Sequence, residues 1–186
     1  DSEVILSAGA INSPQLLLLS GIGINNSNIP IIIDNPEVGQ NLQDHLELYV
    51  QIGCKENNTL LNWATWNKPH KRIKAGLDWF INKKGICASN HFEVGGFIRS
   101  RAGIEHPNIQ YHFLAGAVET QENFLNKHAF QAHAGTMRGK SRGYIKLNKE
   151  NPYLDPIIDP NYLDEEEDLI ELRESIRLTQ EIFSQP

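Results

Sequence analysis

Glu93 is the side chain whose surroundings most clearly suggest chemistry. It lies in residues 90–99 (Asn-His-Phe-Glu-Val-Gly-Gly-Phe-Ile-Arg), between aromatic and apolar neighbours. A carboxylate in such a place is either solvated at a strand end or directed at a cation inside a pocket. A quaternary ammonium group donates no strong hydrogen bond, so its recognition needs a negative charge and aromatic faces, which Trp63, Trp66 and Phe92 could supply. Glu93 is therefore a candidate ligand for a cationic substrate, and a solvated surface glutamate is the alternative.

A second candidate is the glycine turn that follows the apolar residues 4–8. We expect residues 4–8 to form a buried strand, Asn12 and Ser13 to cap the helix that follows, and Pro14 to occupy its first turn, where a missing N–H costs nothing. Gly21 is expected to end this helix. A strand, a glycine turn and a capped helix can bring backbone N–H groups to a phosphate or a nucleotide. The same pattern also forms a plain corner of an α/β domain.

Other familiar sites are not indicated by the sequence. The nearest match to a dinucleotide GxGxxG loop is Gly21-Ile22-Gly23, which follows a helix pattern and has Asn26 in place of the third glycine. The seven histidines form no HExxH motif, and the His-x-Glu at residues 91–93 lacks the downstream Pro-Cys-x-x-Cys of zinc deaminases. Each histidine is expected to be structural, and no metal site is expected.

Composition narrows the class of partner. The 186 residues carry a net charge of −6, which argues against a nucleic-acid partner. No apolar run approaches the roughly 20 residues of a membrane-spanning helix, so no transmembrane segment is expected. The basic cluster of His70, Lys71, Arg72 and Lys74 is interpreted as the solvated side of a helix. Because the chain starts beside a buried-looking strand, we expect it to be an internal fragment of a longer protein.

The periodicity of apolar residues predicts the elements that must position these candidates. Residues 46–52 alternate between apolar and polar types, as in a half-buried strand, and residues 69–83 predict an amphipathic helix. The expected apolar stripe of that helix consists of Ile73, Leu77, Phe80 and Ile81. Four further strands and a C-terminal helix with an acidic first turn are expected. The strands are placed at residues 92–99, 109–115, 130–136 and 143–147.

The fold class expected from this order is α/β followed by α+β. A strand–helix beginning precedes an antiparallel sheet. We place an α/β part at residues 1–45, an antiparallel-sheet domain with the helix 69–83 at residues 46–160, and a returning helix at residues 161–186.

Two sequence blocks resemble a known family. Gly9-Ala10, Ser13-Pro14, the paired leucines and residues 20–23 (Ser-Gly-Ile-Gly) together resemble the second signature of the GMC (glucose–methanol–choline) flavoprotein oxidoreductases. Residues 38–45 (Val-Gly-Gln-Asn-Leu-Gln-Asp-His) follow at the separation that this family shows. The similarity extends over most of the chain, including residues 95–100, 106–113, 137–139 and 159–163.

The resemblance implies an incomplete GMC fold, namely the C-terminal part of an FAD-binding α/β domain and an antiparallel substrate-binding sheet. It implies FAD as the cofactor, with Ala8 and Gly9 as backbone contacts. It places the dinucleotide loop and the catalytic histidine outside this chain, so no catalytic residue is expected within it. In choline-oxidising members a glutamate matching Glu93 holds the trimethylammonium group, and His45 is expected to anchor the loop at the domain junction.

The expected function is therefore that of a fragment of an FAD-dependent alcohol dehydrogenase. The full enzyme would oxidise choline to betaine aldehyde by hydride transfer to the flavin, and the fragment alone would be inactive. Another alcohol, such as a sugar or an aryl alcohol, and a non-catalytic interaction module are the alternatives. The partner is a small-molecule alcohol, and the sequence does not define the electron acceptor. The resemblance implies the mitochondrial inner membrane in a eukaryote, and the cytoplasm or the membrane in a bacterium.

Overall fold

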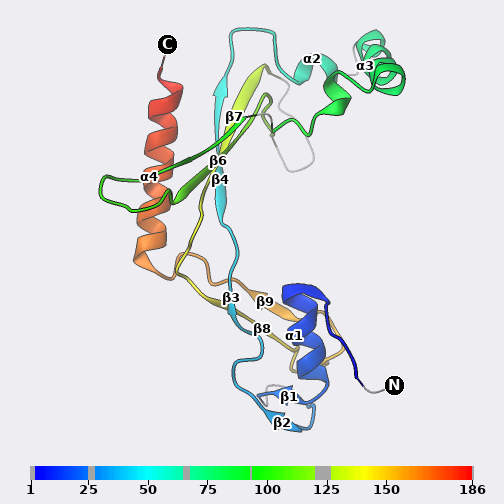
Figure 1. The fold of residues 1–186 in the computed structure, drawn as a ribbon, viewed down its shortest axis with the longest axis vertical. Coiled ribbons are helices and arrows are strands. Elements are labelled where there is room, and N and C mark those ends of the chain that lie inside the picture. The colour runs from blue at the N-terminus through cyan, green and yellow to red at the C-terminus, as the bar shows by residue number, and fades with distance from the viewer. Residues whose placement is uncertain (1–2, 25–27, 65–67, 93, 120–126, 186) are drawn as a thin grey trace. The chain divides into compact units, whose positions relative to one another are not determined.

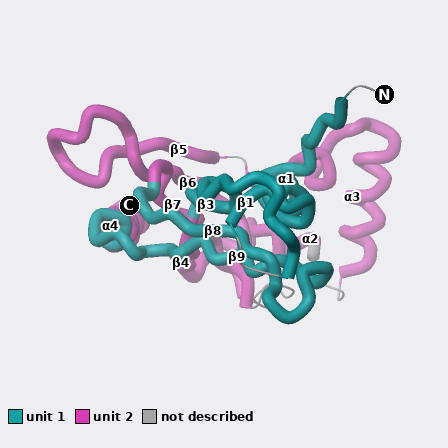
Figure 2. The backbone as a smooth tube through the Cα atoms, turned by 90° about the horizontal axis from the view of Figure 1, so that it is seen from below, with its two compact units in different colours: residues 1–45, 139–169 teal, residues 46–138, 170–186 magenta. Residues whose placement is uncertain are grey.

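The computed structural model describes residues 3–24, 28–64, 68–92, 94–119 and 127–185 (Figure 1). The chain divides into two compact units, each of which combines two stretches of sequence (Figure 2). The first unit contains residues 1–45 and 139–169, and the second contains residues 46–138 and 170–186.

The first unit contains one helix and two small sheets. Its elements are the helix α1 (Gly9–Leu19), the parallel pair β1 (Ile22–Gly23) and β2 (Ile33–Asp34), and the antiparallel strands β3 (Gln40–Leu42), β8 (Gly143–Lys146) and β9 (Ile157–Asp159), in the order β3-β8-β9. Helix α1 packs against β8. Leu18, Ile145 and Leu147 are buried here, so one leucine of α1 and the apolar residues at β8 supply the core of this unit.

Helix α1 begins earlier than predicted. It starts at Gly9, whose φ of +84° makes the turn into the helix, so Asn12 and Ser13 are not its caps and Pro14 lies inside it. The Ser13 hydroxyl accepts a hydrogen bond from the backbone N–H of Ala8 at 3.0 Å. That hydrogen bond closes the first turn of the helix, immediately before Pro14. The predicted end is confirmed, because the helix stops at Leu19 and Gly21 then has a φ of +76°.

The predicted strand at residues 4–8 is wrong. These residues form no strand, and Val4 and Ile5 are 87% and 80% exposed. A buried strand requires neighbours on both sides, and no other part of the described chain pairs with this segment. The apolar residues 31–33 also remain exposed, and only Ile33 of them belongs to a strand.

The second unit is built on a four-stranded antiparallel sheet. The strands are β4 (Glu47–Gly53), β5 (Val94–Ile98), β6 (Ile109–Leu114) and β7 (Ala129–Thr136), in the order β4-β7-β6-β5. Helix α4 (Glu166–Phe183) belongs to this unit from residue 170 onwards. Three further elements complete the described part of the unit. These are α2 (Leu61–Ala64), α3 (Pro69–Asn82) and the 3₁₀ turn η1 (Ile86–Ala88). All four predicted strands of this region are confirmed.

The core of the second unit lies between the sheet and α4. Ile109, Tyr111, Ala132 and Ala134 are buried, and Leu178 and Phe183 of α4 pack against them. The small side chains of Ala132 and Ala134 leave room for Leu178 and Phe183 on this face. The completely buried positions of α4 itself are Ser175 and Thr179.

Tyr111 links the sheet to α4 through its hydroxyl group. The Tyr111 hydroxyl donates to the Ser175 carbonyl oxygen at 3.1 Å and lies 3.0 Å from the Thr179 hydroxyl. Burial raises the pKa of Tyr111, against a smaller lowering by the Thr179 hydrogen bond. A neutral hydroxyl therefore holds the helix to the sheet at neutral pH.

Helix α3 is confirmed, but its predicted burial is wrong. Ile73, Leu77, Phe80 and Ile81 all face solvent, and the buried residue of this helix is Ala75. The helix ends at Asn82 and is followed by Lys83 in the left-handed conformation (φ +53°). The periodicity identified the helix correctly but could not say which of its sides the unit covers.

Candidate functional site

One face of the sheet in the second unit carries polar and aromatic side chains. In the register of the strands, Tyr49 of β4 pairs with His133 of β7, and His133 pairs with His112 of β6. Because side chains alternate across a strand, this row lies on the face opposite Ala132, Ala134 and their partner α4. We call it the polar face. Its members from the three strands are Glu47, Tyr49, Gln51, Gln110, His112, Gln131 and His133.

His133 is the most constrained side chain of the polar face. It is 8% exposed, and its Nδ1 lies 2.9 Å from Oε1 of Glu47. Its Nε2 lies 2.5 Å from Nε2 of Gln131. A carboxylate only accepts, so Nδ1–H donates to Glu47, and the unprotonated Nε2 accepts from the Gln131 amide. The imidazole is thereby held in one tautomer and one orientation.

Gln131 leaves one acceptor unused. Its side chain is only 1% exposed, and its Oε1 has no hydrogen-bond partner among the described residues. An unsatisfied buried polar atom costs about 1–3 kcal/mol. Such atoms are rare in native proteins, and a catalytic role or a bound water or ion is among their explanations. A hydroxyl group is a donor of the kind that this oxygen would accept.

Two aromatic rings lie beside His133. The ring centroid of Tyr49 is 4.0 Å from that of His133, and Phe92 approaches the same imidazole edge-on at 5.1 Å. Phe92 also contacts His112, at 6.0 Å between ring centroids. Tyr49 and Phe92 both remain exposed, as does part of Glu47. The polar face thus offers open aromatic surface next to a carboxylate, which suits an organic cation.

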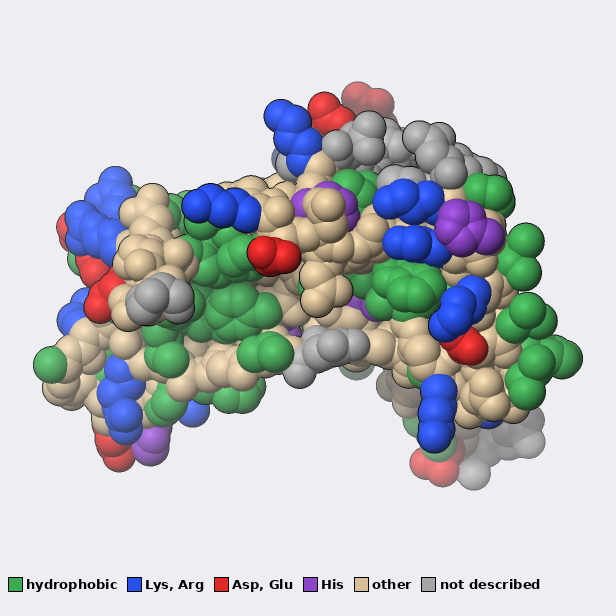
Figure 3. All heavy atoms as spheres, turned by 90° about the horizontal axis from the view of Figure 1, so that it is seen from above, with side chains coloured by type: hydrophobic (Ala, Val, Ile, Leu, Met, Phe, Trp, Pro, Cys, Tyr) green, Lys and Arg blue, Asp and Glu red, His purple; other side chains and the backbone are tan. Residues whose placement is uncertain are grey.

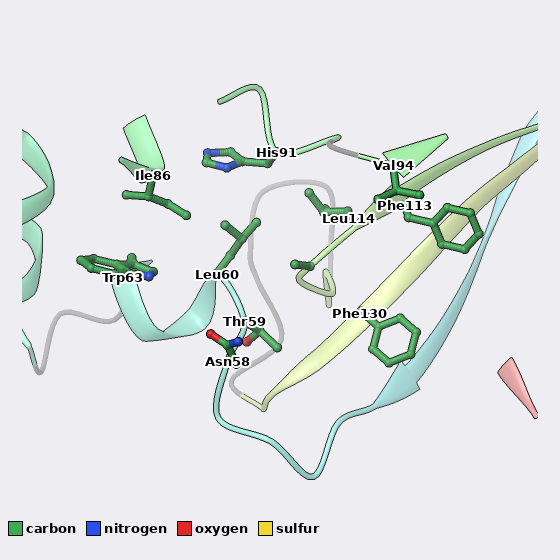
Figure 4. A pocket seen from close by; sticks show the side chains of 11 residues that line it. Asn58, Thr59, Leu60, Trp63, Ile86, His91, Val94, Phe113, Leu114 and Phe130 are labelled. Carbon is green, nitrogen blue, oxygen red and sulfur yellow. The ribbon is translucent and has the colours of Figure 1, made fainter. Parts of the chain in front are cut away.

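A separate cavity of about 410 Å³ lies at one end of the same sheet (Figure 4). Leu60, Trp63 and Ile86 line it together with His91, whose ring lies beside these apolar side chains (Figure 4). His91 has a φ of +71°, its backbone N–H donates to Oγ of Ser89, and its Nδ1 has no partner within the described part of the chain. The cavity is mainly apolar, with polar groups from Asn58, Thr59 and His91 in its lining.

The predicted aromatic surroundings of Glu93 are only partly described. Glu93 and Trp66 lie outside the described residues, so the proposed role of Glu93 stays a prediction. Phe92 is on the polar face, whereas Trp63 lines the cavity with the Lys71 ammonium 6.0 Å from its ring. The sequence assigned Phe92 and Trp63 to one site, but the structure places Phe92 on the polar face and Trp63 in the cavity.

Ala8 and Gly9, the predicted FAD contacts, lie at the beginning of α1 in the first unit. Both are exposed, and a Cβ built on Gly9 would meet no atom within 4 Å. The helix has no side-chain cap at Ala8 and no acidic residue in its first turn. Its first N–H groups lack intrahelical partners and can face a phosphate or a cofactor edge. These residues fit a backbone contact with a cofactor.

The loop that contains His45 is held mainly by the side chain of Asp44. The Asp44 carboxylate accepts hydrogen bonds from the Tyr162 hydroxyl and from the His45 backbone N–H, the latter at 2.9 Å. The Tyr162 hydrogen bond, followed by that of the His45 amide, lowers the pKa of Asp44, and the Asp44 contact raises the pKa of Tyr162. His45 takes part through its backbone.

The sequence analysis did not identify Glu47, Gln131 or His133 as site residues. Alternation would have placed Glu47 and Tyr49 on the same face of the predicted strand 46–52, and Gln131 and His133 on the same face of the predicted strand 130–136. It could not have shown that the two strands are neighbours. No group of three or more His, Cys, Asp or Glu side chains that could hold a metal ion occurs within the described ranges. Nor does any helix in the described part of the chain have the length and the apolar composition needed to cross a membrane.

Family models for GMC oxidoreductases match both ends of the chain. The N-terminal model of this family matches residues 1–47, and the C-terminal model matches residues 139–186. Among curated relatives, an oxygen-dependent choline dehydrogenase of Klebsiella pneumoniae is 48% identical over the whole chain, which covers 34% of that protein. The corresponding protein of Burkholderia thailandensis is 50% identical, with 99% of this chain and 33% of the relative covered. The chain thus spans about a third of the length of these relatives.

Solved structures show the same fold. Formate oxidase superimposes with a TM-score of 0.80 at 25% identity, over 97% of this chain and 37% of that one. A fungal aryl-alcohol oxidase gives a TM-score of 0.74 at 18% identity, over 97% of this chain and 38% of the other. A structure of the Aspergillus oryzae formate oxidase is described by its FAD modification, which agrees with the predicted cofactor. The curated relatives are bacterial, so the mitochondrial expectation gains no support.

Proposed function

Because this chain belongs to the GMC oxidoreductase family, we propose that the full-length protein is an FAD-dependent enzyme that oxidises choline to betaine aldehyde. The observation that carries this proposal is the identity of about half of all residues, over the whole chain, with choline dehydrogenases. The structural neighbours support the fold and a flavin cofactor, but they include oxidases of formate and of aryl alcohols. The choice of choline therefore depends on the sequence relatives and on the residues of the site.

In this proposal the polar face forms a wall of the substrate pocket. Helix α4 covers the opposite face at Ala132 and Ala134, so we assign the ligand to the polar face. Tyr49 and Phe92 offer aromatic surface to the trimethylammonium group, and Glu93, the residue after Phe92, supplies the negative charge. Oε1 of Gln131, which lacks a partner among the described residues, is available to a hydroxyl group.

Backbone atoms of Ala8 and Gly9 would contact the cofactor at the start of α1. FAD, when bound, supplies the acceptor for the hydride that leaves the alcohol carbon. By family resemblance, the base that removes the hydroxyl proton lies in a part of the full-length protein beyond this chain. The chain of 186 residues alone is therefore expected to be inactive, which stays a prediction.

The test is the substitution Glu93→Gln in the full-length protein. The kcat/KM for choline and for its uncharged isostere 3,3-dimethylbutan-1-ol should be measured side by side, with Glu150→Gln as the control for an exposed glutamate. A carboxylate that holds the cation predicts a loss of at least tenfold for choline and little change for the isostere. Equal losses for both alcohols would remove Glu93 from cation recognition, and a wild-type preference for an uncharged alcohol would favour a GMC enzyme with another substrate.

A non-catalytic interaction module is the alternative function that the sequence leaves open. The full-length protein purified from its native source should show a flavin absorbance band if it is the proposed enzyme. Protein without that band, and without choline-dependent reduction of an added acceptor, would favour the interaction module instead.

A further inference from the structure

Glu47 differs from other acidic side chains of this protein in its partner. Asp78, for example, pairs with Lys74 at 3.1 Å, and on the face drawn in Figure 3 Lys and Arg side chains lie close to Asp and Glu side chains. Glu47 instead lies 2.9 Å from Nδ1 of His133, which is 8% exposed. A carboxylate beside an imidazole decides which ring nitrogen carries the proton. Glu47 can therefore act on the polar face through His133.

The orientation of the His133 ring is fixed from two sides. The ring centroid of Tyr49 lies 4.0 Å from that of His133, and Phe92 meets the same ring edge-on at 5.1 Å. A turn of the imidazole about its own bond would displace these close-packed rings. Nδ1 therefore stays toward Glu47, and Nε2 stays toward Gln131.

The Gln131 amide can bind this imidazole in either of two arrangements. With the proton on Nδ1, the bare Nε2 accepts from the Gln131 amide nitrogen, 2.5 Å away, and the amide oxygen points elsewhere. With the proton on Nε2, the amide would turn over and use its oxygen on the ring, so an N–H group would take the place of that oxygen. The second arrangement leaves the bare Nδ1 facing a carboxylate, where two acceptors repel. Glu47 therefore selects the first arrangement.

The amide oxygen of Gln131 is left without a donor. It is buried and has no hydrogen-bond partner among the described residues. Gln51 is paired with Gln131 in the strand register, but its amide nitrogen donates to the Val118 carbonyl oxygen at 3.1 Å. The unused acceptor thus belongs to an amide that is bonded to the imidazole between Tyr49 and Phe92, two exposed rings. A hydroxyl group that reaches this oxygen would satisfy it.

We propose that Glu47 is a positioning residue that acts through His133 to keep the amide oxygen of Gln131 available to the substrate hydroxyl. The inference rests on the proposed function, in which the polar face forms a wall of the substrate pocket. It assigns recognition of the hydroxyl to Gln131, while the aromatic rings and Glu93 take the cation. A quaternary ammonium ion without a hydroxyl makes no use of this oxygen, so Gln131 sets the preference for an alcohol over such an ion.

The hydrogen bond to Gln131 acts on binding rather than on the chemical step. The hydroxyl has one proton, and the base beyond this chain must take that same proton during oxidation. The bond to Gln131 is therefore made in the complex that precedes proton transfer and is given up during the transfer. An interaction of that kind lowers KM without raising kcat.

Steady-state kinetics of the full-length protein test the proposal. The KM and kcat for choline should be measured with an artificial electron acceptor, together with the inhibition constant of ethyltrimethylammonium, which has the same cation but no hydroxyl. Glu47→Met removes the acceptor for Nδ1–H, so we expect a KM for choline about tenfold higher, a kcat that is no lower and an unchanged inhibition constant. Gln131→Met should give the same result. The double variant should be no worse than either single variant, because both changes remove the same hydrogen bond.

Control variants separate the tautomer of His133 from the charge of Glu47. Glu47→Gln removes the charge but keeps an oxygen that can accept from Nδ1–H, so it should keep most of the affinity for choline that Glu47→Met loses. Glu105→Met is the matched surface control, since Glu105 lies 3.4 Å from His106 but its side chain is 88% exposed. If Gln131→Met does not fold, His133→Phe carries the same test, because it also leaves the amide without its partner.

Three results would overturn this inference and leave the proposed function standing. An unchanged KM for choline in Gln131→Met would mean that only water meets the amide oxygen. Equal losses for choline and ethyltrimethylammonium in Glu47→Met and Glu47→Gln would mean that Glu47 acts by its charge on the cation. A lower kcat at an unchanged KM would assign these residues to the chemical step. Wild-type protein that does not oxidise choline would instead overturn the proposed function, and this inference with it.

Discussion

The two faces of the sheet β4-β7-β6-β5 are made from the same strands but serve different purposes. Under α4, Ile109, Ala132 and Ala134 pack against one another, and the Tyr111 hydroxyl has partners on the helix. On the polar face, Gln131 and His133 are also buried, and the Gln131 amide oxygen lacks a partner among the described residues. The face under α4 stabilises the unit, and we propose that the polar face binds a ligand.

The largest expected effect is on the face under α4. Ile109→Ala removes a completely buried side chain and leaves a cavity, so we expect a loss of about 3 kcal/mol in the free energy of unfolding. Urea denaturation of the full-length protein measures it. The kcat/KM of the remaining folded protein should not change, and a large catalytic defect would erase the distinction between the faces.

Asp168 lies on neither face of the sheet, so the loss of stability in an Asp168 variant can be compared with the losses on the two faces. Its carboxylate accepts from the backbone N–H groups of Lys140 and Ser141 and from the Ser141 hydroxyl, at 2.7, 2.8 and 2.6 Å. Burial raises the pKa of Asp168, but the hydrogen bonds of Ser141 and Lys140 outweigh it and lower the pKa below 3.8. Asp168→Asn should cost about 2 kcal/mol at pH 7.

The sign of the pH dependence follows from that lowered pKa. The carboxylate contributes its stability above the unfolded pKa of about 4, and this contribution is lost as the pH falls through the lower folded pKa. Unfolding of the wild type and Asp168→Asn should therefore converge in the acid range. A gap that stays constant below pH 4 would contradict the assignment.

On the polar face we expect the opposite pattern to that of Ile109. His133→Phe keeps an aromatic ring between Tyr49 and Phe92 but removes both ring nitrogens. The kcat/KM for choline should fall about tenfold, which corresponds to about 1.4 kcal/mol. Thermal unfolding should show a smaller change than in Ile109→Ala, and a variant that is unstable yet fully active would contradict a role in the substrate pocket.

The smallest expected loss of stability comes from Tyr111, on the face under α4. Tyr111→Phe deletes only the hydroxyl that bonds to Ser175 and Thr179, so we expect a loss of about 1 kcal/mol. Activity should be unchanged. If this variant loses as much stability as Ile109→Ala, the hydroxyl rather than packing would hold α4 on the sheet.

The sequence predicted the elements of the second unit better than their surroundings. Alternation located β4, whereas the turn residues between short apolar runs located β5, β6 and β7. It could not bring Glu47 next to His133, 86 positions apart, because strand order is set by long-range pairing. It also assigned burial to α3, since an apolar stripe is the same pattern whether protein or another apolar surface covers it.

The first unit shows the other limit of the sequence. The apolar run at residues 4–8 suggests a central strand, yet no described strand lies beside it. Pro14 suggested the start of α1, but Gly9 and the Ser13 hydroxyl start the helix earlier. In both places a local rule was overridden by the presence or absence of a neighbour.

The most direct test of the central claim is the anaerobic decrease of flavin absorbance when choline is mixed with the full-length protein. The wild type, His133→Phe and the mild core variant Ile109→Val should be compared at equal flavin content. The account predicts that the wild type and Ile109→Val lose the absorbance at the same rate, and that His133→Phe is about tenfold slower at low choline. Equal rates in all three proteins, or no decrease with choline in the wild type, would contradict it.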